Sequence, residues 1–324
     1  MVRMKVLKNN ISKNTMLIML VFSFFTACTE TDKRFSDTPT SGEINISADQ
    51  SLEPIVDAEL QVFHGHYKHA KINPFYAGEG DAMDLLLKDS VRVAVVTREL
   101  TQEEKEYFKK IKITPRTTKI AYDALAIIAH NSNTDTNLTY NQVRDIFSGK
   151  ISNWKDINKN SYLGEIRVIF DNKSSSTARF VKEKFLNNSS DFPSNTFATN
   201  TNKELVDYVE KNKNSIGIIG VNWISDLDDP SSIDFLKRIK VIAISPPDTA
   251  KGAGEFYKPY QAYIAQKIYP LSREVYIVSR EARTGLGSGF AAFVAGDKGQ
   301  RIILKSALVP ATAPIRLVSL GNNN

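Results

Sequence analysis

Residues 168–180 read VIFDNKSSSTARF, in which a short apolar run passes through a polar turn into a cluster of hydroxyl side chains. The apolar run has the length and composition of a buried strand. Behind the hydroxyl cluster, Val181 and Phe185 have the spacing of the inward face of a helix. The change from strand to helix recurs along the chain, and this alternation predicts an α/β protein with helices on a mostly parallel sheet.

Short apolar runs of the same kind predict the other strands. Together with residues 166–171, they lie at 44–47, 91–97, 122–130, 215–221, 240–245 and 274–279. Several predicted helices open with a threonine that is followed three residues later by Glu or Gln, which is the capping-box pattern. These pairs are Thr101 with Glu104, Thr139 with Gln142, and Thr201 with Glu204. The capping pattern therefore places the starts of three helices.

The helix that follows Lys173 is the first candidate site. A helix N-terminus presents unpaired N–H groups and the positive end of the peptide dipole. The hydroxyls of Ser175, Ser176 and Thr177 would add donors at that point, and Arg179 in the first turn would add a guanidinium. These groups together predict an anion site. The alternative is that one serine merely caps the helix.

Three other loops are candidates for the same site, because ligands of open α/β sheets bind beyond the carboxyl ends of the strands. They are Ala48, Asp49, Gln50 and Ser51; the glycine-bearing turn Gly78, Glu79, Gly80 and Asp81; and Thr97 with Arg98. Each has a structural alternative. Asp49 or Ser51 would serve only as a helix cap, the glycine turn would be an ordinary loop, and Arg98 would be a solvated surface arginine.

Two patterns do not support catalysis or metal binding. His64, His66 and His69 lie close together, but no cysteine or carboxylate partner is evident, so we expect no metal site and no cofactor. Residues 285–289, GLGSG, have the wrong spacing for a dinucleotide fingerprint or a nucleophile elbow. No activated nucleophile or pair of acid and base carboxylates can be placed, and we expect a binding protein and not an enzyme.

The charge is concentrated at the N-terminus. The 324 residues carry a formal net charge of +6, but four of the basic residues stand in the first thirteen positions: Arg3, Lys5, Lys8 and Lys13. Removing these four charges from +6 leaves +2. Because no dense basic stripe is seen elsewhere, a nucleic-acid partner is not expected.

The same N-terminal segment predicts export and lipid anchoring. A basic stretch precedes an apolar run at residues 16–25, which is too short to span a bilayer but suits a signal peptide over residues 1–27. It ends in Phe-Thr-Ala-Cys, and Cys28 is the only cysteine of the chain. This ending resembles a bacterial lipobox, which implies a lipid on Cys28. Residues 28–42, rich in Thr, Ser, Asp and Pro, then read as a flexible tether. The alternative is an uncleaved anchor or an ordinary signal peptide with a chance cysteine.

The order of several longer motifs resembles the phosphate-binding receptors of bacterial phosphate ABC importers, and in particular the short lipoprotein branch found in Bacteroidetes. The most specific stretches are residues 139–154, TYNQVRDIFSGKISNW; residues 269–278, YPLSREVYIV; and residues 293–310, FVAGDKGQRIILKSALVP. The resemblance covers nearly the whole chain after Cys28. It implies a receptor in the cell envelope, on the periplasmic side or at the outer membrane, that captures a small oxyanion.

The resemblance further implies a type II periplasmic-binding-protein fold, in which two α/β lobes are joined by two crossing segments with the ligand cleft between them. Lobe one would comprise residues 43–121 plus 243–324, and lobe two residues 122–242. A separately encoded ABC permease and ATPase would receive the ligand from a monomeric receptor. The alternative in another class is a sensor or assembly lipoprotein that uses the same fold to signal to a membrane partner.

Departures from the family pattern bear on the ligand. Asp171, Asn172, Lys173 and Ser174 stand where the family has Arg-x-Asp-Gly. Glu79 departs from the family's glycine-serine loop, and Thr97 with Arg98 replaces a loop that often holds an aspartate. We therefore expect Arg179 and Arg98 to supply the positive charge. A carboxylate that accepts a proton of the ligand would favour phosphate over sulfate, and the candidates for it are Asp49, Glu79 and Asp81.

Overall fold

The computed structural model describes residues 37–187 and 191–313, so the predicted signal peptide and Cys28 lie outside the described residues. The predicted tether extended to residue 42, but its last residues belong to the fold. The Asp37 carboxylate is buried, pairs with Arg92 at 2.6 Å and Arg283 at 2.5 Å, and accepts the amide of Leu286 at 2.6 Å. Burial opposes ionisation, yet these donors hold the pKa of Asp37 below its usual value. These contacts fix the chain ahead of the first strand.

One mixed sheet organises the described residues, with the strand order β2-β1-β3-β11-β4-β8-β6-β7. Its strands are β1 (Ser41–Asp49), β2 (His69–Ala77), β3 (Val93–Val96), β4 (Arg116–His130), β6 (Arg167–Phe170), β7 (Thr196–Ala198), β8 (Ser215–Gly220) and β11 (Ser272–Ser279). Short strands β9 (Ile239–Val241) and β12 (Val309–Pro310) pair with β4, while β5 (Asn137–Leu138) and β10 (Ala243–Ile244) form a separate pair.

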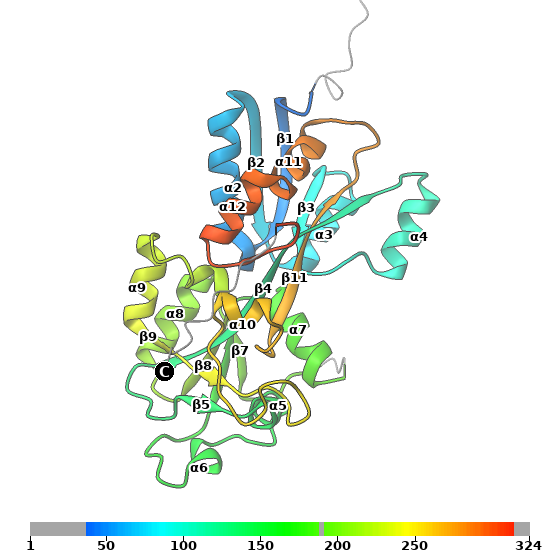
Figure 1. The fold of residues 1–324 in the computed structure, drawn as a ribbon. Helices are drawn as coiled ribbons and strands as arrows, with labels where there is room; N and C mark the ends of the chain where they lie inside the picture. Colours follow the sequence, from blue (N-terminus) through cyan, green and yellow to red (C-terminus); the bar gives the residue numbers. More distant parts are fainter. Residues whose placement is uncertain (1–36, 188–190, 314–324) are drawn as a thin grey trace, which may run out of the picture. The chain divides into compact units, whose positions relative to one another are not determined.

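The pairing differs between the ends and the centre of the sheet. The strands around β1 and those around β6 pair in parallel, as the strand-helix alternation predicts. In the centre, β11 runs antiparallel to β3 and β4, and β4 runs antiparallel to β8. The prediction of a mostly parallel sheet is therefore wrong at the centre. The physical reason is that β4, fifteen residues long, continues from one parallel group to the other (Figure 1).

Helices follow the strands in sequence, as expected for an α/β protein. They are α2 (Glu53–His66), α3 (Glu79–Leu87), α4 (Gln102–Lys110), α5 (Tyr140–Phe147), α6 (Trp154–Ile157), α7 (Ser176–Phe185), α8 (Asn202–Lys211), α9 (Pro230–Arg238), α10 (Gln261–Ala265), α11 (Leu286–Ala295) and α12 (Asp297–Lys305), with short 3-10 turns η2 (Gln50–Leu52) and η3 (Val221–Trp223). Within residues 37–187 and 191–313, no helix is long and apolar enough to cross a membrane.

Local capping matches the sequence patterns. Thr101 and Glu104 form a complete capping box at α4, and Thr139 and Gln142 form another at α5. Thr201 caps α8 by accepting the Glu204 amide at 3.1 Å, so all three predicted helix starts are confirmed.

Buried apolar side chains form separate clusters on the two parallel groups. The largest packs β4, β6 and β8 with α5, α7 and α8, and includes Trp154, Phe170 and Ile218. A second joins β1, β2 and β3 to α2, α11 and α12 around Phe63 and Phe290. A third packs α3 and α4 on the other face of β3 and β11. The long strand β4 thus passes from one apolar core to the other, because Ile120 and Ala121 belong to the second cluster and Ala124–Ala129 to the first, with the buried Asp123 between them.

Candidate functional site

Three segments far apart in the sequence meet at one arginine. The guanidinium of Arg273, on β11, donates from Nη1 to the hydroxyl of Ser176 at 2.7 Å and from Nη2 to the hydroxyl of Ser51 at 2.9 Å. The two hydroxyl oxygens are 3.1 Å apart. Ser51 lies in η2 just beyond β1, and Ser176 is the first residue of α7. The start of α7 is therefore in direct contact with the carboxyl end of β1.

Carboxylates orient this arginine and one of its serines. Asp123, on β4, accepts Arg273 Nε at 2.9 Å and Nη2 at 2.7 Å through the same oxygen, Oδ2. Asp49, at the end of β1, accepts the Ser51 hydroxyl at 2.7 Å. Because Ser51 has only one hydroxyl proton and donates it to Asp49, Ser176 must donate in the contact between the two serines. We call Asp49, Ser51, Asp123, Ser176 and Arg273 the inner cluster.

Two further buried polar groups lie at the start of α7. Thr177 is fully buried, and its hydroxyl has no hydrogen-bond partner among the described residues. Asp171, which directly follows β6, is also fully buried, and neither of its carboxylate oxygens accepts a hydrogen bond of good geometry within the described chain. Buried polar groups nearly always find partners. These atoms can therefore still accept hydrogen bonds, and the Thr177 hydroxyl can also donate one.

The inner cluster contains two carboxyl groups, those of Asp49 and Asp123, and one guanidinium, that of Arg273. Burial, then the Glu79 carboxylate and to a smaller extent Asp171, raises the pKa of Asp49 to about 7, while Arg273 opposes this change. Burial also raises the pKa of Asp123 against the attraction of Arg273. It raises the pKa of Asp171 against the nearby Ser175 hydroxyl and Arg273. Desolvation thus works against ionisation at all three carboxyls, because charge is costly in a dry site.

A second group of charges surrounds Glu79, which is buried at the start of α3. One of its oxygens accepts the amide of Thr97 at 2.7 Å and the Thr97 hydroxyl at 2.8 Å. The other accepts Nε of Arg179 at 2.5 Å and lies 3.7 Å from Nε of Arg98. Arg98 also pairs with Glu104 at 2.7 Å. We call Glu79, Thr97, Arg98, Glu104 and Arg179 the outer cluster.

The contacts in the outer cluster show whether Arg179 and Arg98 are free to supply positive charge to a ligand. Amide, hydroxyl and guanidinium donors of the kind that an oxyanion requires are already directed at Glu79. Arg179 gives a further bond to Glu183, and the attraction of Glu79 and Glu183 raises the pKa of Arg179 although burial opposes this. The prediction that Arg179 and Arg98 supply the charge for a ligand is therefore not supported by their contacts, whereas Arg273 directs its guanidinium at hydroxyl groups.

The other predicted loop residues meet the same turn before α7. Gly80 donates its amide to the Ser174 carbonyl at 3.4 Å, and Asp81 accepts the Ser174 hydroxyl at 2.8 Å. A Cβ atom on Gly78 would lie 2.9 Å from the Ser174 backbone, so only glycine allows this close approach. Ser175 caps α7, as the alternative reading had it, by accepting the Ala178 amide at 3.2 Å. The hydroxyls of Ser176 and Thr177 take no part in this cap, and Ser176 contacts Arg273 and Ser51.

The residues of the loop 48–51 do not all contribute to the site. Ala48 packs in the core cluster on β1, and Gln50 opens η2. Only Asp49 and Ser51 of this loop contribute polar side chains to the inner cluster. The loops predicted from four separate stretches of sequence are thus brought together, though not every residue in them faces the same group.

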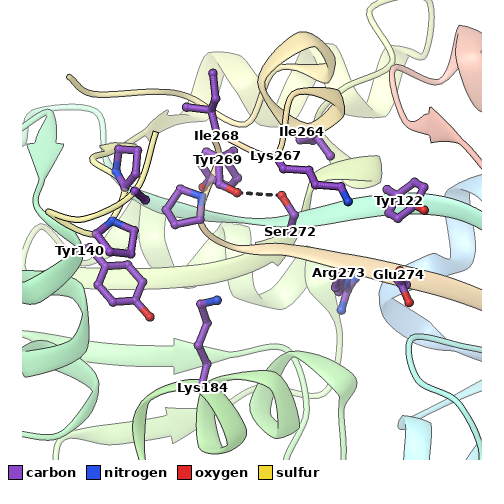
Figure 2. A pocket seen from close by; sticks show the side chains of 14 residues that line it. Tyr122, Tyr140, Lys184, Ile264, Lys267, Ile268, Tyr269, Ser272, Arg273 and Glu274 are labelled. Atoms are coloured by element: carbon purple, nitrogen blue, oxygen red, sulfur yellow. Dashed lines mark hydrogen bonds between the residues drawn. The ribbon is translucent and has the colours of Figure 1, made fainter. Parts of the chain in front are cut away.

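Two cavities flank these clusters. One, of about 320 Å³, is lined by Glu79, Gly80, Arg98, Ser175 and Arg179 together with Lys173 and Lys182. The other, of about 370 Å³, lies beside Arg273 and Glu274 on β11. Figure 2 shows Lys184 extending from α7 toward this second cavity, with Tyr140 beside it and Lys267 reaching toward Tyr122. Basic side chains therefore border both cavities.

Comparison with known proteins places this arrangement in a family. Residues 35–298 match the family described as the PBP superfamily domain. The chain belongs to the PBP superfamily. Its fold is similar to that of a putative phosphate ABC transporter substrate-binding protein with bound phosphate from Clostridium perfringens, with a TM-score of 0.69 and 23% identity over 83% of this chain and 100% of that one. An ABC-type phosphate transport receptor from Vibrio cholerae gives a TM-score of 0.61 and 23% identity with the same coverage. The predicted fold class is confirmed.

Curated relatives agree with this placement in the PBP superfamily. The chain is 26% identical over 263 residues to the phosphate-binding protein PstS of Staphylococcus saprophyticus, which covers 80% of this chain and 77% of the relative. It is 27% identical over 254 residues to PstS of Staphylococcus epidermidis, which covers 77% of this chain and 73% of the relative. The predicted resemblance to phosphate-binding receptors is confirmed, whereas the lipoprotein branch stays a prediction.

Sequence reasoning missed three groups of this PBP-superfamily site. Arg273 lies on β11, Asp123 lies in the middle of β4, and Asp171 directly follows β6. A charged residue in a buried strand must have a charged or hydrogen-bonding partner, and that signal was available in residues 269–278 and 122–130. What the sequence lacked was any indication that these positions pair with each other.

The histidine group found in the sequence has a structural role in this PBP-superfamily fold. His64 Nε2 accepts the amide of Ile72 at 3.1 Å, which ties α2 to β2, and burial lowers its pKa. His66 Nδ1 lies 3.0 Å from the Val62 carbonyl. Within the ranges that the structure describes, no group of three or more His, Cys, Asp or Glu side chains could hold a metal ion.

Proposed function

We propose that this protein captures a small oxyanion, with phosphate as the first choice, on the outer side of the cytoplasmic membrane and passes it to an ABC importer. The observation that carries the proposal is the inner cluster. Arg273 is held by Asp123 and donates to Ser51, in η2, and to Ser176, the first residue of α7. Hydroxyls, a guanidinium and a helix N-terminus together form an anion receptor. The relatives named as phosphate-binding proteins and transport receptors support phosphate as the ligand.

The same residues are suited to binding a ligand without converting it. Arg273 and the two serines form a set of donors, and the acids beside them are oriented by hydrogen bonds to these donors. Lys184 and Lys267 beside the neighbouring cavity add positive charge, which speeds the approach of an anion. We therefore propose a receptor that binds its ligand and releases it unchanged.

Thermal stability in the presence of ligands tests the proposal. Phosphate at about one hundred times its Kd should stabilise the folded protein by about 2.7 kcal/mol, because it binds only the folded state. Sulfate and a series of small carboxylates serve as comparisons. If none of these anions raises the melting temperature, the receptor proposal is wrong.

The two-lobed division is part of the same proposal. We propose hinge closure between one lobe built on β1–β3 and another built on β6–β8, with β4 and the segment before β11 as the crossings. Ile244, Ile264 and Leu271 pack in the core of β6 and β8, which favours a second crossing near residue 271 over the predicted boundary at 243. Small-angle scattering should show a smaller radius of gyration with phosphate than without it.

Membrane attachment through a lipid on Cys28 is proposed from the sequence. In detergent phase partition, the protein made in a bacterium should enter the detergent phase, and a Cys28→Ala variant should stay in the aqueous phase, because its acyl chains would be missing. Equal partition of the two proteins would contradict lipidation.

A further inference from the structure

The outer cluster joins two parts of the molecule that have separate apolar cores. On one side, α3 packs through Leu86 in the same cluster as β3 and β11. On the other side, α7 packs through Val181 in the cluster of β4, β6 and β8. Arg179 extends from α7 and bonds through Nε to the carboxylate of Glu79, the first residue of α3, at 2.5 Å. This ion pair therefore connects a helix of one predicted lobe to a helix of the other.

Further hydrogen bonds accompany this ion pair. Nη2 of Arg179 donates to the hydroxyl of Thr97 at 2.9 Å, and that hydroxyl donates to Glu79 at 2.8 Å. Ser174, in the turn before α7, donates its hydroxyl to Asp81 of α3 at 2.8 Å. All donors and acceptors in this set are protein groups, and none belongs to the inner cluster. The set can therefore hold α3 against α7 while the inner cluster holds the ligand.

Each member of the ion pair has a second partner on its own side. If α7 moves away, Glu79 keeps the amide of Thr97 at 2.7 Å, and Arg179 keeps Glu183, four residues later in α7, at 2.5 Å. The loss of a buried ion pair is most costly when one charge is left without a partner, and here neither charge is. The side chain of Arg179 is 24% exposed, so water can replace its contact with Glu79. A contact of this kind can form and break repeatedly.

We propose that Glu79 and Arg179 are positioning residues: their ion pair latches α3 to α7 when the lobes close, and it thereby sets how long phosphate stays bound. This inference rests on the proposed function, hinge closure included. Because the latch exists only in the closed form, its loss should speed the release of phosphate. Capture starts from the open form, in which the latch is absent, so it depends on the two residues only through their long-range charge.

Stopped-flow fluorescence with inorganic phosphate separates capture from release. Trp223 reports closure, because its Nε1 donates to the Ser51 carbonyl at 3.1 Å and so joins η3 to η2. The observed rate is measured against phosphate concentration, which gives the capture rate constant as the slope and the release rate as the intercept. In Arg179→Ala, release should be about three- to fivefold faster than in the parent, which is the size of effect that a partly exposed ion pair produces.

A double variant separates the latch from simple effects of charge. Arg179→Ala and Glu79→Gln alter the local charge in opposite directions, so long-range attraction should shift the two capture rates in opposite directions. The lost ion pair is common to both variants, so the double variant should release phosphate no faster than Arg179→Ala alone. Arg179→Lys keeps a cation within reach of Glu79 and should release phosphate more slowly than Arg179→Ala.

Glu183→Gln is the matched control. It removes the partner of Arg179 within α7 but leaves the latch, so it should release phosphate at the parent rate. The unfolding transition of each variant verifies that it folds. Release from Arg179→Ala at the parent rate, or an equal acceleration in Glu183→Gln, overturns this inference and leaves the proposed function in place. No phosphate binding by the parent overturns the proposed function and this inference with it.

Discussion

The inner and outer clusters both pair arginine with carboxylate, but they direct their free donors differently. In the outer cluster the carboxylate is the centre: Glu79 receives the Thr97 amide and hydroxyl and the Arg179 guanidinium. In the inner cluster the arginine is the centre: Arg273 is held by Asp123 and extends its remaining N–H groups to hydroxyls. The outer arginines are about one-fifth exposed, whereas the Arg273 side chain is 2% exposed.

This difference shows why an arginine near a predicted site is not automatically the partner of the ligand. Arg98 and Arg179 are each shared between two carboxylates and are partly exposed, so solvent screens their attraction for a further anion, whereas Arg273 is buried and pairs with Asp123 alone among the described carboxylates. A buried guanidinium that contacts neutral hydroxyls can exchange those contacts for an oxyanion, and this exchange gives a large gain in interaction energy. We therefore propose that Arg273 binds the ligand, whereas Glu79 and Arg179 pair α3 with α7.

The largest effect is expected for Arg273→Ala. Removing a buried charge that pairs with the ligand should weaken phosphate binding by about 2–5 kcal/mol, as measured by titration calorimetry. Arg301→Ala is the control, because Arg301 lies on the exposed surface of α12 and pairs with Asp297. Folding of both variants is verified by their unfolding transitions, since Asp123 loses its ion pair. Unchanged phosphate affinity in a folded Arg273→Ala protein would contradict the assignment.

A smaller effect is expected at Glu59, a buried acid that has no arginine beside it. Burial raises its pKa to about 9 from the usual 4.5, so the folded state binds more protons than the unfolded state between these values. Stability therefore decreases as the pH rises from about 4.5 to about 9. Glu59→Gln should remove this slope and raise the free energy of unfolding by about 1–3 kcal/mol near pH 8. Chemical denaturation at about pH 5 and about pH 8 measures this, with the exposed Glu106→Gln as control.

The smallest effect is expected for Arg179→Ala. Arg179 is partly exposed and its guanidinium pairs with Glu79 and Glu183, not with Ser51 or Ser176, so phosphate binding should weaken by about 1 kcal/mol or less. The same calorimetric titration used for Arg273→Ala gives the comparison directly. A loss as large as that of Arg273→Ala would instead place the ligand in the outer cluster and reverse the assignment.

Local sequence patterns located most of the site loops because their physics is local. The loop 78–81 and the turn before α7 were both selected from glycine and hydroxyl patterns, and they do meet at Ser174. By contrast, β2 was not predicted. Its sequence HAKINPFYA alternates weakly and contains a proline, which an edge strand tolerates. The split of the predicted strand 240–245 into β9 and β10 likewise follows from pairing with different partners.

From its sequence alone, this protein is an α/β member of a recognisable family, with its helix caps and the serine cluster at the start of α7. These features depend on residues within one turn of each other, whose hydrogen bonds form whatever the rest of the chain does. Only the tertiary structure shows that Arg273, and not Arg179 or Arg98, faces Ser51 and Ser176. That outcome depends on contacts between residues about 100 to 220 positions apart, which the long strand β4 and the antiparallel β11 bring together.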